Sequence, residues 1–216
     1  MPDPATVVAS PDPARAAGDS PKRAAILEAA AAVFLEAGVE AASMDEIARR
    51  ARVSKATVYS HFDGKHALLR AIVHGRCRGL MPAMDSAEFA ALAPAQALTL
   101  VGRRLLDMMF APDAVALYRV VLVEAARAPE LARAFYENGP DRVARELADY
   151  LRVQHAAGRL RAPDPRLAAE QFLGAVLCQS HLRQLLSITA MPQDGAARGA
   201  QVQAAVALFL AATRPG

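Results

Sequence analysis

The sequence predicts an all-α protein, and two observations carry that prediction. No stretch alternates apolar and polar residues with the Val, Ile, Thr and aromatic content of a strand, whereas helix-favouring Ala, Leu, Arg and Glu dominate. Proline or glycine then marks each plausible break between helices. We therefore expect an N-terminal three-helix domain with a linking fourth helix, residues 20–80, and a second helical domain, residues 81–216.

Composition excludes several classes of protein. Apolar residues make up 54% of the 216, but charged or amide residues break every apolar run before the roughly 18 residues that a membrane span requires. The cysteines are Cys77 and Cys178, which form no disulfide framework and suit a reducing compartment. Residues 1–19 are rich in Pro, Ala, Asp and Ser and carry no secretory signal. We expect a disordered tail there and a cytoplasmic protein without membrane association.

The first helix is predicted to begin at Pro21, because proline suits the first position of a helix, and to end at Gly38. Its buried face is expected to consist of Ile26, Ala30, Val33, Phe34 and Ala37.

Two short helices are expected next. In the run SMDE, the Ser43 hydroxyl and the Glu46 carboxylate are predicted to accept each other's backbone N–H groups as a capping box. Ser54 is predicted to cap the second short helix, about 55–60. A longer helix, about 64–79, would then bury Leu68, Leu69, Ile72 and Val73.

Six further helices are expected in the second domain. They lie near 94–110, 113–127, 129–138, 140–157, 164–188 and 197–213. The last two are apolar around much of their circumference, so they require cover on two sides. A two-fold homodimer through these helices, with Leu177 and Leu208 facing outward, provides that cover. A monomer with a central helical hairpin is the alternative.

Positive charge is concentrated in the N-terminal segment. Residues 20–80 hold ten Lys or Arg against six Asp or Glu, whereas residues 81–216 hold 14 against 13. Two short helices in a basic segment suit DNA binding, because a short exposed second helix can enter a major groove about 12 Å wide. Val58 and Phe62 are four residues apart and would anchor this helix to its support.

The run MDEIARRARVSKATVYSHFDGKHALL resembles the DNA-binding signature of the TetR family of repressors, over about residues 22–75. The resemblance implies a helix-turn-helix DNA-binding domain and a helical C-terminal domain for ligand binding and dimerisation. By motif position, the residues that face DNA would be Ser43, Ser54, Lys55, Thr57, Tyr59, His61 and Lys65. The sequence departs from the family pattern at Ala56, Gly64 and His66.

Two aromatic residues of the second short helix, Tyr59 and His61, are candidates for contact with DNA. Tyr59 is interpreted as a phosphate contact rather than as a packed aromatic, since a phenol on a short exposed helix requires a polar partner. For His61, contact with the DNA backbone and packing at the helix end both stay open.

Methionine and aromatic side chains are concentrated in the middle of the second domain. Core packing explains most of them, but a subset lining a pocket for a lipophilic ligand is a hypothesis that rests mainly on the resemblance. The candidates are Met108, Met109, Tyr118, Phe135, Phe172 and His181.

No catalytic residue, metal or cofactor is predicted. Cys178 and His181 are three residues apart and would share a helix face, but two ligands do not complete a metal site. The sequence contains no glycine-rich phosphate loop, nucleophile elbow or paired metal-binding motif.

The sequence therefore predicts a homodimeric transcriptional repressor that binds double-stranded operator DNA and is released by a small apolar ligand. Two alternatives stay open. One is a small-molecule binding or catalytic protein that retains a helix-turn-helix unit, and the other is a protein that packages DNA without sequence preference.

Overall fold

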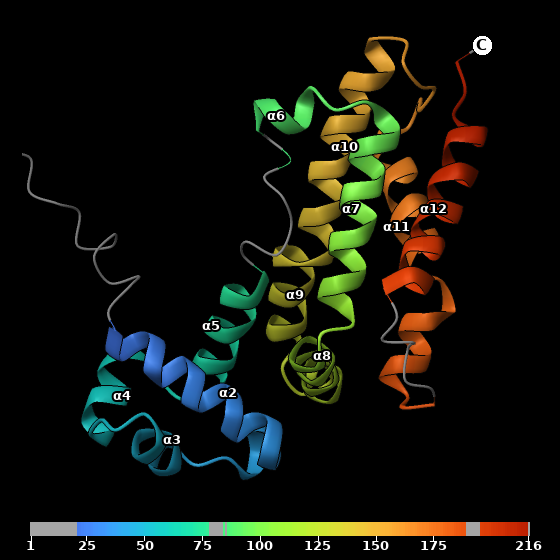
Figure 1. Ribbon diagram of the computed structural model, residues 1–216. Helices are drawn as coiled ribbons and strands as arrows, with labels where there is room; N and C mark the ends of the chain where they lie inside the picture. The colour runs from blue at the N-terminus through green and yellow to red at the C-terminus, as the bar shows by residue number, and fades with distance from the viewer. Residues whose placement is uncertain (1–20, 78–83, 85, 189–194, 216) are drawn as a thin grey trace, which may run out of the picture. The chain divides into compact units, whose positions relative to one another are not determined.

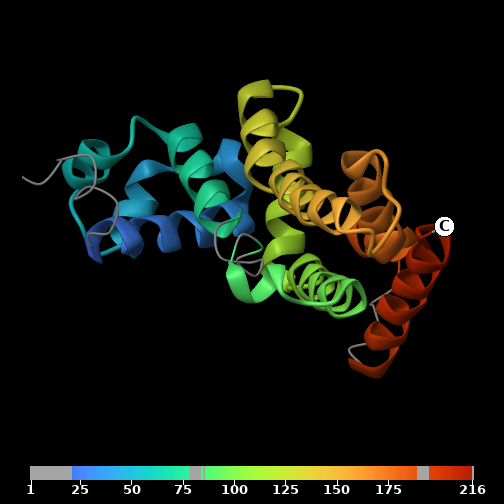
Figure 2. The same ribbon diagram turned by 90° about the horizontal axis from the view of Figure 1, so that it is seen from above.

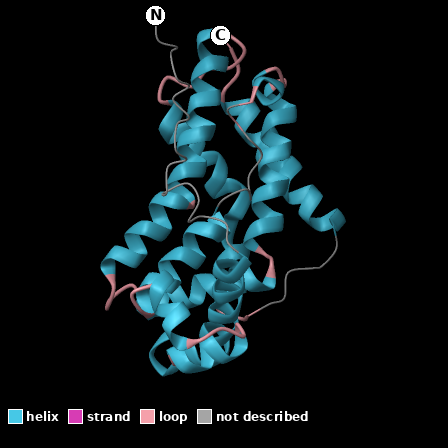
Figure 3. Ribbon diagram, turned by 90° about the vertical axis from the view of Figure 1, so that its left-hand side faces the viewer, coloured by secondary structure: helices cyan, strands magenta, loops and turns pink. Residues whose placement is uncertain are grey.

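The computed structural model describes residues 21–77, 84, 86–188 and 195–215, and every regular element in these ranges is a helix (Figures 1 and 3). The predicted all-α fold is confirmed. The chain divides into two compact units, with the boundary between Leu69 and Arg70, inside α5 (Lys65–Cys77). Each unit is described by itself.

Two expectations fall outside the described residues, namely the tail at residues 1–19 and the domain boundary between residues 80 and 81. In the described ranges, no helix has both the length and the apolar character that a membrane crossing requires.

The N-terminal unit consists of α2 (Pro21–Ala41), α3 (Met44–Arg50), α4 (Lys55–His61) and the start of α5. α3 packs against both α2 and α4. Apolar side chains that are at most 6% exposed form the core of this unit: Ile26, Ala30, Val33, Phe34, Ile47, Val58, Phe62, Leu68 and Leu69. The predicted buried face of the first helix is confirmed at four of its five positions.

The exception is Ala37, which is exposed, while Val39 is buried in its place. Gly38 has φ 77° and ψ 165°, a conformation that glycine adopts without the steric cost of a Cβ atom. The helical path is interrupted there, although one further turn follows to Ala41. The interruption redirects the chain after Ala37, so Val39 reaches the core at a position that continuous helical spacing does not predict. The exposure of Ala37 precedes the interruption and does not follow from it.

Seven helices occupy the described part of the second unit beyond α5. They are α6 (Ala87–Ala90), α7 (Pro94–Met109), α8 (Pro112–Glu124), α9 (Pro129–Asn138), α10 (Pro140–Ala156), α11 (Pro165–Leu185) and α12 (Gly195–Ala212). Each helix from α7 to α11 begins with a proline, whose missing N–H would have had no partner inside the helix. The sequence did not predict α6, a single turn capped by the Ser86 hydroxyl and anchored by the buried Phe89.

Four long helices build the core of the second unit. α10 packs on α11, and α7 and α12 pack on each other and on α11, so the four run side by side (Figures 1 and 2). Fully buried side chains from all four fill the space between them: Leu98, Leu106, Leu147, Leu151, Phe172, Val176 and Val202.

α7 and α12 approach each other closely at Gly102. A Cβ atom at this position would lie 2.8 Å from Cγ1 of Val202 and 3.5 Å from Cγ2 of Val176. Both valines are fully buried and β-branched, so neither can swing away. The spacing of α7, α11 and α12 therefore depends on a residue without a side chain at position 102.

We expect Gly102→Ala to lower the free energy of unfolding by about 1–3 kcal/mol, because the added methyl group overpacks the core. Gly75→Ala is the control: Gly75 is exposed within α5 and a Cβ there meets nothing within 4 Å. This control should gain about 0.5–1 kcal/mol from the higher helix propensity of alanine. Chemical denaturation of both variants measures the difference, and equal effects would contradict the close approach.

Candidate functional site

α3 and α4 are joined by a tight connection. The chain leaves α3 at Ala51, whose N–H donates to Ile47 O at 2.9 Å, and Val53 N–H reaches back to Ala48 O at 3.1 Å. Arg52 between them has φ 55°, in the left-handed region, which turns the chain sharply. Two short helices separated by such a turn form the helix-turn-helix unit that the sequence predicts.

Serine hydroxyls start both helices. Ser43 Oγ accepts from Glu46 N–H and Ser54 Oγ accepts from Thr57 N–H, each at 3.1 Å. Both N-caps are thus confirmed, but the reciprocal half of the predicted capping box is wrong. The Glu46 carboxylate bonds the guanidinium groups of Arg49 and Arg50 at 2.7–2.8 Å.

α4 is buried on one face and exposed on the other. Val58 is fully buried and Phe62 is 6% exposed, which confirms them as the anchor of the helix. The Arg23 guanidinium lies 5.1 Å from the centroid of the Phe62 ring and covers it with a cation–π contact. Tyr59 is 48% exposed and His61 is also exposed, so neither side chain is used in packing the core.

The structure gathers most of the residues predicted to face DNA on or beside α4. Ser54, Lys55, Thr57, Tyr59 and His61 lie within the helix or at its start. Ser43 is at the start of α3. Lys65 begins α5, and its Nζ donates to Glu40 O at 2.7 Å. Thr57 and Lys65 are half-buried, and the others are exposed.

Carboxylates hold several of the cations in this unit. Arg50 bonds Glu36 of α2 at 2.6 Å and Glu46 of α3 at 2.7 Å. The hydrogen bonds from Arg49 and Arg50 lower the pKa of Glu46 to about 2. These ion pairs link α3 to α2, so Arg50 serves the support of the helix-turn-helix unit.

Lys55 is also paired, but at the surface. Its Nζ lies 2.9 Å from Asp45, and both side chains are more than half exposed. The Asp45 carboxylate raises the pKa of Lys55 through a hydrogen bond and through its charge. The spacing of Glu46, Arg49 and Arg50 could have revealed their ion pairs in the sequence. The Lys55–Asp45 pair joins two helices and carries no such signal.

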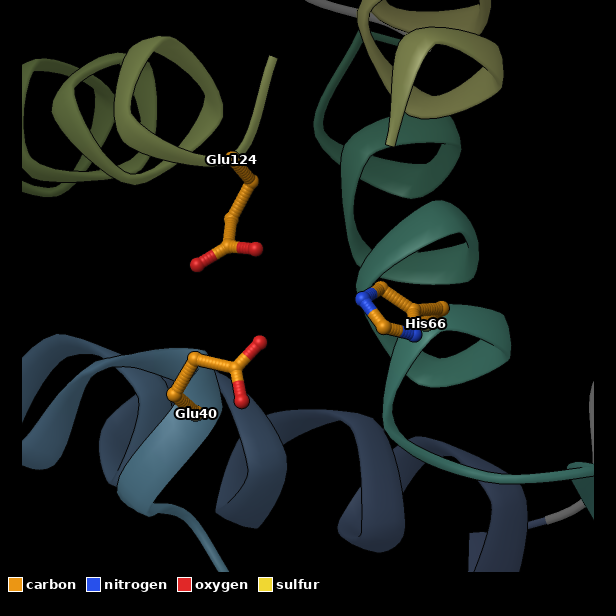
Figure 4. Close-up of side chains that lie close together, drawn as sticks. All are labelled: Glu40, His66 and Glu124. Atoms are coloured by element: carbon orange, nitrogen blue, oxygen red, sulfur yellow. The ribbon is translucent and has the colours of Figure 1, made fainter. Parts of the chain in front are cut away.

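Glu40 and His66 face each other within the N-terminal unit (Figure 4). Both are exposed, and their potential ligand atoms lie within 4.8 Å. Glu124, also drawn in Figure 4, belongs to the second unit. Inside either unit taken alone, the described residues bring together no three His, Cys, Asp or Glu side chains in reach of one ion.

The expectation that Cys178 and His181 share a helix face is wrong. Cys178 has φ 48° and ψ −150°, so α11 is interrupted at this residue and helical spacing does not relate the two side chains. Cys178 is exposed, whereas both ring nitrogens of His181 are buried.

The six candidate pocket residues fall into three groups. Phe172 is fully buried and packs edge-to-face on Phe209, with the ring centroids 5.4 Å apart. Met108 and Met109 are half-buried against the core. The other three form consecutive ring contacts: Tyr118 lies 5.1 Å from Phe135 and 5.1 Å from His181, between ring centroids.

An open groove lies between α11 and α12. Its volume is about 510 Å³, and its lining residues are Ala175, Cys178, Gln179, Ser180, Arg183, Gln201, Ala204, Ala205 and Leu208. This groove contains none of the six candidate pocket residues.

Two family models match the chain. Residues 26–72 match "bacterial regulatory proteins, tetR family", and residues 96–214 match "AefR-like transcriptional repressor, C-terminal domain". The first match contains the helix-turn-helix unit, and the second extends from α7 to the end of α12.

Curated relatives resemble the N-terminal segment. The chain is 44% identical over 54 residues to the HTH-type transcriptional regulator SrpR of Pseudomonas putida, which is 25% of each protein. It is 43% identical over 53 residues to the HTH-type transcriptional regulator UidR of Escherichia coli K12, covering 24% of this chain and 27% of UidR. The chain thus spans about a quarter of the length of these two relatives.

Solved structures resemble almost the whole chain. A TetR-family regulator from Mesorhizobium loti shares 29% identity and superposes with a TM-score of 0.79 over 89% of this chain and 96% of that one. The flavonoid-responsive regulator FrrA shares 36% identity, with a TM-score of 0.75 over 90% of this chain and 97% of FrrA. With both family models and these relatives in agreement, the chain belongs to the TetR family, whose members are transcriptional regulators and not enzymes.

Proposed function

We propose that this protein is a homodimeric repressor that acts in the cytoplasm, binds a near-palindromic operator through α4 of each subunit and is released by a small lipophilic ligand. One observation carries the proposal. α4 is fixed by its buried Val58 and Phe62 and leaves Lys55 and Tyr59 exposed, within the segment that matches the TetR DNA-binding family model.

Each residue predicted to face DNA receives a role that its surroundings allow. Lys55 and Lys65 are assigned to phosphates, because an ammonium group attracts phosphate whatever the base sequence. Lys65 keeps two N–H donors beyond the one used by Glu40 O. Tyr59 and the Ser43 and Ser54 hydroxyls are assigned to the sugar–phosphate backbone. Thr57 and His61 complete the surface of α4 that we assign to the major groove of the DNA.

Repression is the direction of regulation that we favour. The family model that matches residues 96–214 is described as a repressor domain. A relative that is 41% identical over 66 residues, FasR of Mycolicibacterium smegmatis, is named an activator, but it covers only 31% of this chain. The more extensive resemblance therefore favours a repressor.

The partner that we assign to the groove between α11 and α12 is a second copy of this chain. Leu182 of α11, Leu186 directly after it and Leu208 of α12 are 56%, 59% and 66% exposed. Removing such side chains from water is favourable and drives most protein–protein association. Leu177 is not the outward residue that we expected, because it packs partly against the core.

For the ligand, we propose a neutral, largely apolar molecule held in the second unit near Met108, Met109, Tyr118, Phe135 and His181. Phe172 lies deeper in the same core. The resemblance to FrrA, which is named for its response to flavonoids, supports a flat aromatic compound. Methionine and aromatic side chains can adapt around such a molecule.

An operator footprint tests this function against its alternatives. DNA fragments selected from genomic DNA by the protein should show a short, symmetric protected site. Protection without defined ends would support DNA packaging, and absence of protection would support a small-molecule binding protein that only retains the helix-turn-helix unit.

We expect Lys55→Ala and Lys65→Ala each to weaken binding to operator and to random DNA alike, because phosphate contacts do not depend on sequence. Each should reduce the slope of log affinity against log salt by about one. Asp45→Asn should act in the opposite direction and tighten binding to both DNAs by about 2- to 5-fold, since it releases Lys55. Binding isotherms at several salt concentrations measure all three effects.

The control for these charge changes is Arg152→Ala. Arg152 forms an exposed ion pair with Asp149 on α10, so this variant loses one positive charge outside α4 and its surroundings. Its salt slope should equal that of the parent protein. A slope that is unchanged in both lysine variants would refute their assignment to phosphates.

We expect Leu208→Arg to separate the dimer, because it places an unpaired charge in an apolar interface. Operator affinity should fall with it, since one subunit contacts only one half-site. Val153→Arg is the control, because Val153 is 56% exposed on α10, outside the last two helices. Sedimentation in which Leu208→Arg stays as dimeric as Val153→Arg would rule out this interface.

Ligand and operator are expected to weaken each other's binding by the same factor. A typical coupling of about 1–3 kcal/mol corresponds to a 5- to 150-fold change in affinity, and linkage makes the change reciprocal. Compounds from a lipophilic aromatic library that raise the Tm should therefore be titrated with and without operator. Equal affinities in the two titrations would exclude that compound as an inducer.

A further inference from the structure

Four rings from four parts of the second unit meet in one aromatic cluster: Phe110 at the end of α7, Tyr118 of α8, Phe135 of α9 and His181 of α11. The His181 ring lies edge-to-face on Tyr118 at 5.1 Å and 78°, and on Phe110 at 6.2 Å and 85°. Tyr118 continues the cluster to Phe135 at 5.1 Å and 87°. Apart from the buried Phe110, the rings are half-buried.

His181 is the polar member of this cluster whose hydrogen-bonding groups are unused. Both Nδ1 and Nε2 are buried, and neither has a hydrogen-bond partner in the described part of the chain. A neutral imidazole offers one donor and one acceptor, and leaving both unpaired after removal from water is unfavourable. A phenylalanine would fill the same space without that cost, so packing alone does not explain a histidine here.

The backbone on both sides of His181 keeps the ring in this position. One turn earlier, the non-helical conformation of Cys178 sets the direction of the last part of α11. After His181, the Arg119 guanidinium of α8 holds the end of the helix, donating to Gln184 O at 2.7 Å, Leu185 O at 2.9 Å and Ser187 Oγ at 2.8 Å. These features set the course of the backbone on both sides of His181, and the ring packs on Tyr118 and Phe110.

The surroundings of His181 favour the neutral ring. Burial lowers the pKa of His181 below its usual value. Arg119 on α8 and Arg183 on α11, the helices that carry Tyr118 and His181, are both cations. Arg119 is already engaged with the end of α11. No carboxylate contacts the ring among the described residues, so nothing there would stabilise an imidazolium.

We propose that His181 is the ligand-recognition residue of the second unit, and that it selects neutral aromatic compounds carrying a hydroxyl group. The inference rests on the proposed function, since it names the chemical class of the ligand. A neutral imidazole nitrogen accepts a hydrogen bond from a phenolic O–H, while the surrounding rings pack edge-to-face on a flat aromatic body. An acyl chain would leave both nitrogens unpaired.

The test uses two compounds of nearly equal size, 4-phenylphenol and 4-methylbiphenyl, which differ by a hydroxyl in place of a methyl group. Calorimetric titration of the 216-residue protein should show that the phenol binds at least about tenfold more tightly, because a site that hydrogen-bonds a hydroxyl discriminates against analogues lacking it. Equal affinities, or no binding of either compound, would overturn the assignment of the ligand class.

Three variants separate recognition from packing. His181→Phe keeps an aromatic ring but removes both nitrogens, so this variant should bind the two compounds with equal affinity. Because no unpaired nitrogen is then buried, the Tm of the free protein should rise by about 2–4 °C. His181→Gln keeps a donor and an acceptor and should retain part of the preference for the phenol. Phe135→Leu should weaken the binding of both compounds but preserve the preference for the phenol.

A preference for the phenol that survives in His181→Phe, or a fall in the Tm of that variant, would overturn the proposal, since the nitrogens would then have another role. Operator footprints of the same variants, recorded without ligand, keep this test separate from the proposed function. An unchanged footprint together with a lost preference supports recognition by His181. A footprint absent from the parent protein would instead contradict the proposed repressor.

Discussion

The placement of α4 depends on the burial of Val58 and Phe62. An isolated helix of seven residues is not stable in water, because its few hydrogen bonds do not offset the cost of nucleation. Burying a side chain of this kind contributes about 1.5–3 kcal/mol, and Arg23 covers the Phe62 ring from outside. Since one face is fully used in this way, Lys55, Tyr59 and His61 remain exposed on a helix whose position is fixed. The exposed face of α4 is therefore a consequence of packing on its opposite side.

Sequence reasoning located helices well where one residue decides the outcome. Proline begins each helix from α7 to α11, and serine hydroxyls begin α3 and α4, because both effects act within one turn. It failed where a side chain had several partners to choose from. Glu46 bonds Arg49 and Arg50 instead of completing its capping box, since two guanidinium groups provide stronger, charge-assisted hydrogen bonds.

Breaks in helical geometry caused the other errors. Spacing rules assume a continuous helix, so they missed the burial of Val39 beyond the interruption at Gly38 and wrongly placed Cys178 and His181 on one face of α11. Glycine is a visible sign of a possible break, but nothing marks Cys178 in the sequence. In the candidate site, too, local patterns could be predicted and contacts between helices could not. The sequence predicted the residues on and beside α4, whereas the Lys55–Asp45 ion pair and the unpaired nitrogens of His181 depend on contacts between helices.

The two units differ in how they use polar groups. In the N-terminal unit, the cations that support α3 are held by carboxylates at 2.6–2.8 Å, so that support is stable and Lys55 is the paired cation that DNA can most readily recruit. In the second unit, the nitrogens of His181 are buried and have no partner among the described residues, so the proposed ligand, by pairing with one of them, would recover stability that the free protein lacks. A protein that binds its ligand in this way gains stability by mass action in the liganded state only. Because α5 contributes residues to both units, the proposed effect of the ligand on operator binding would pass through this helix.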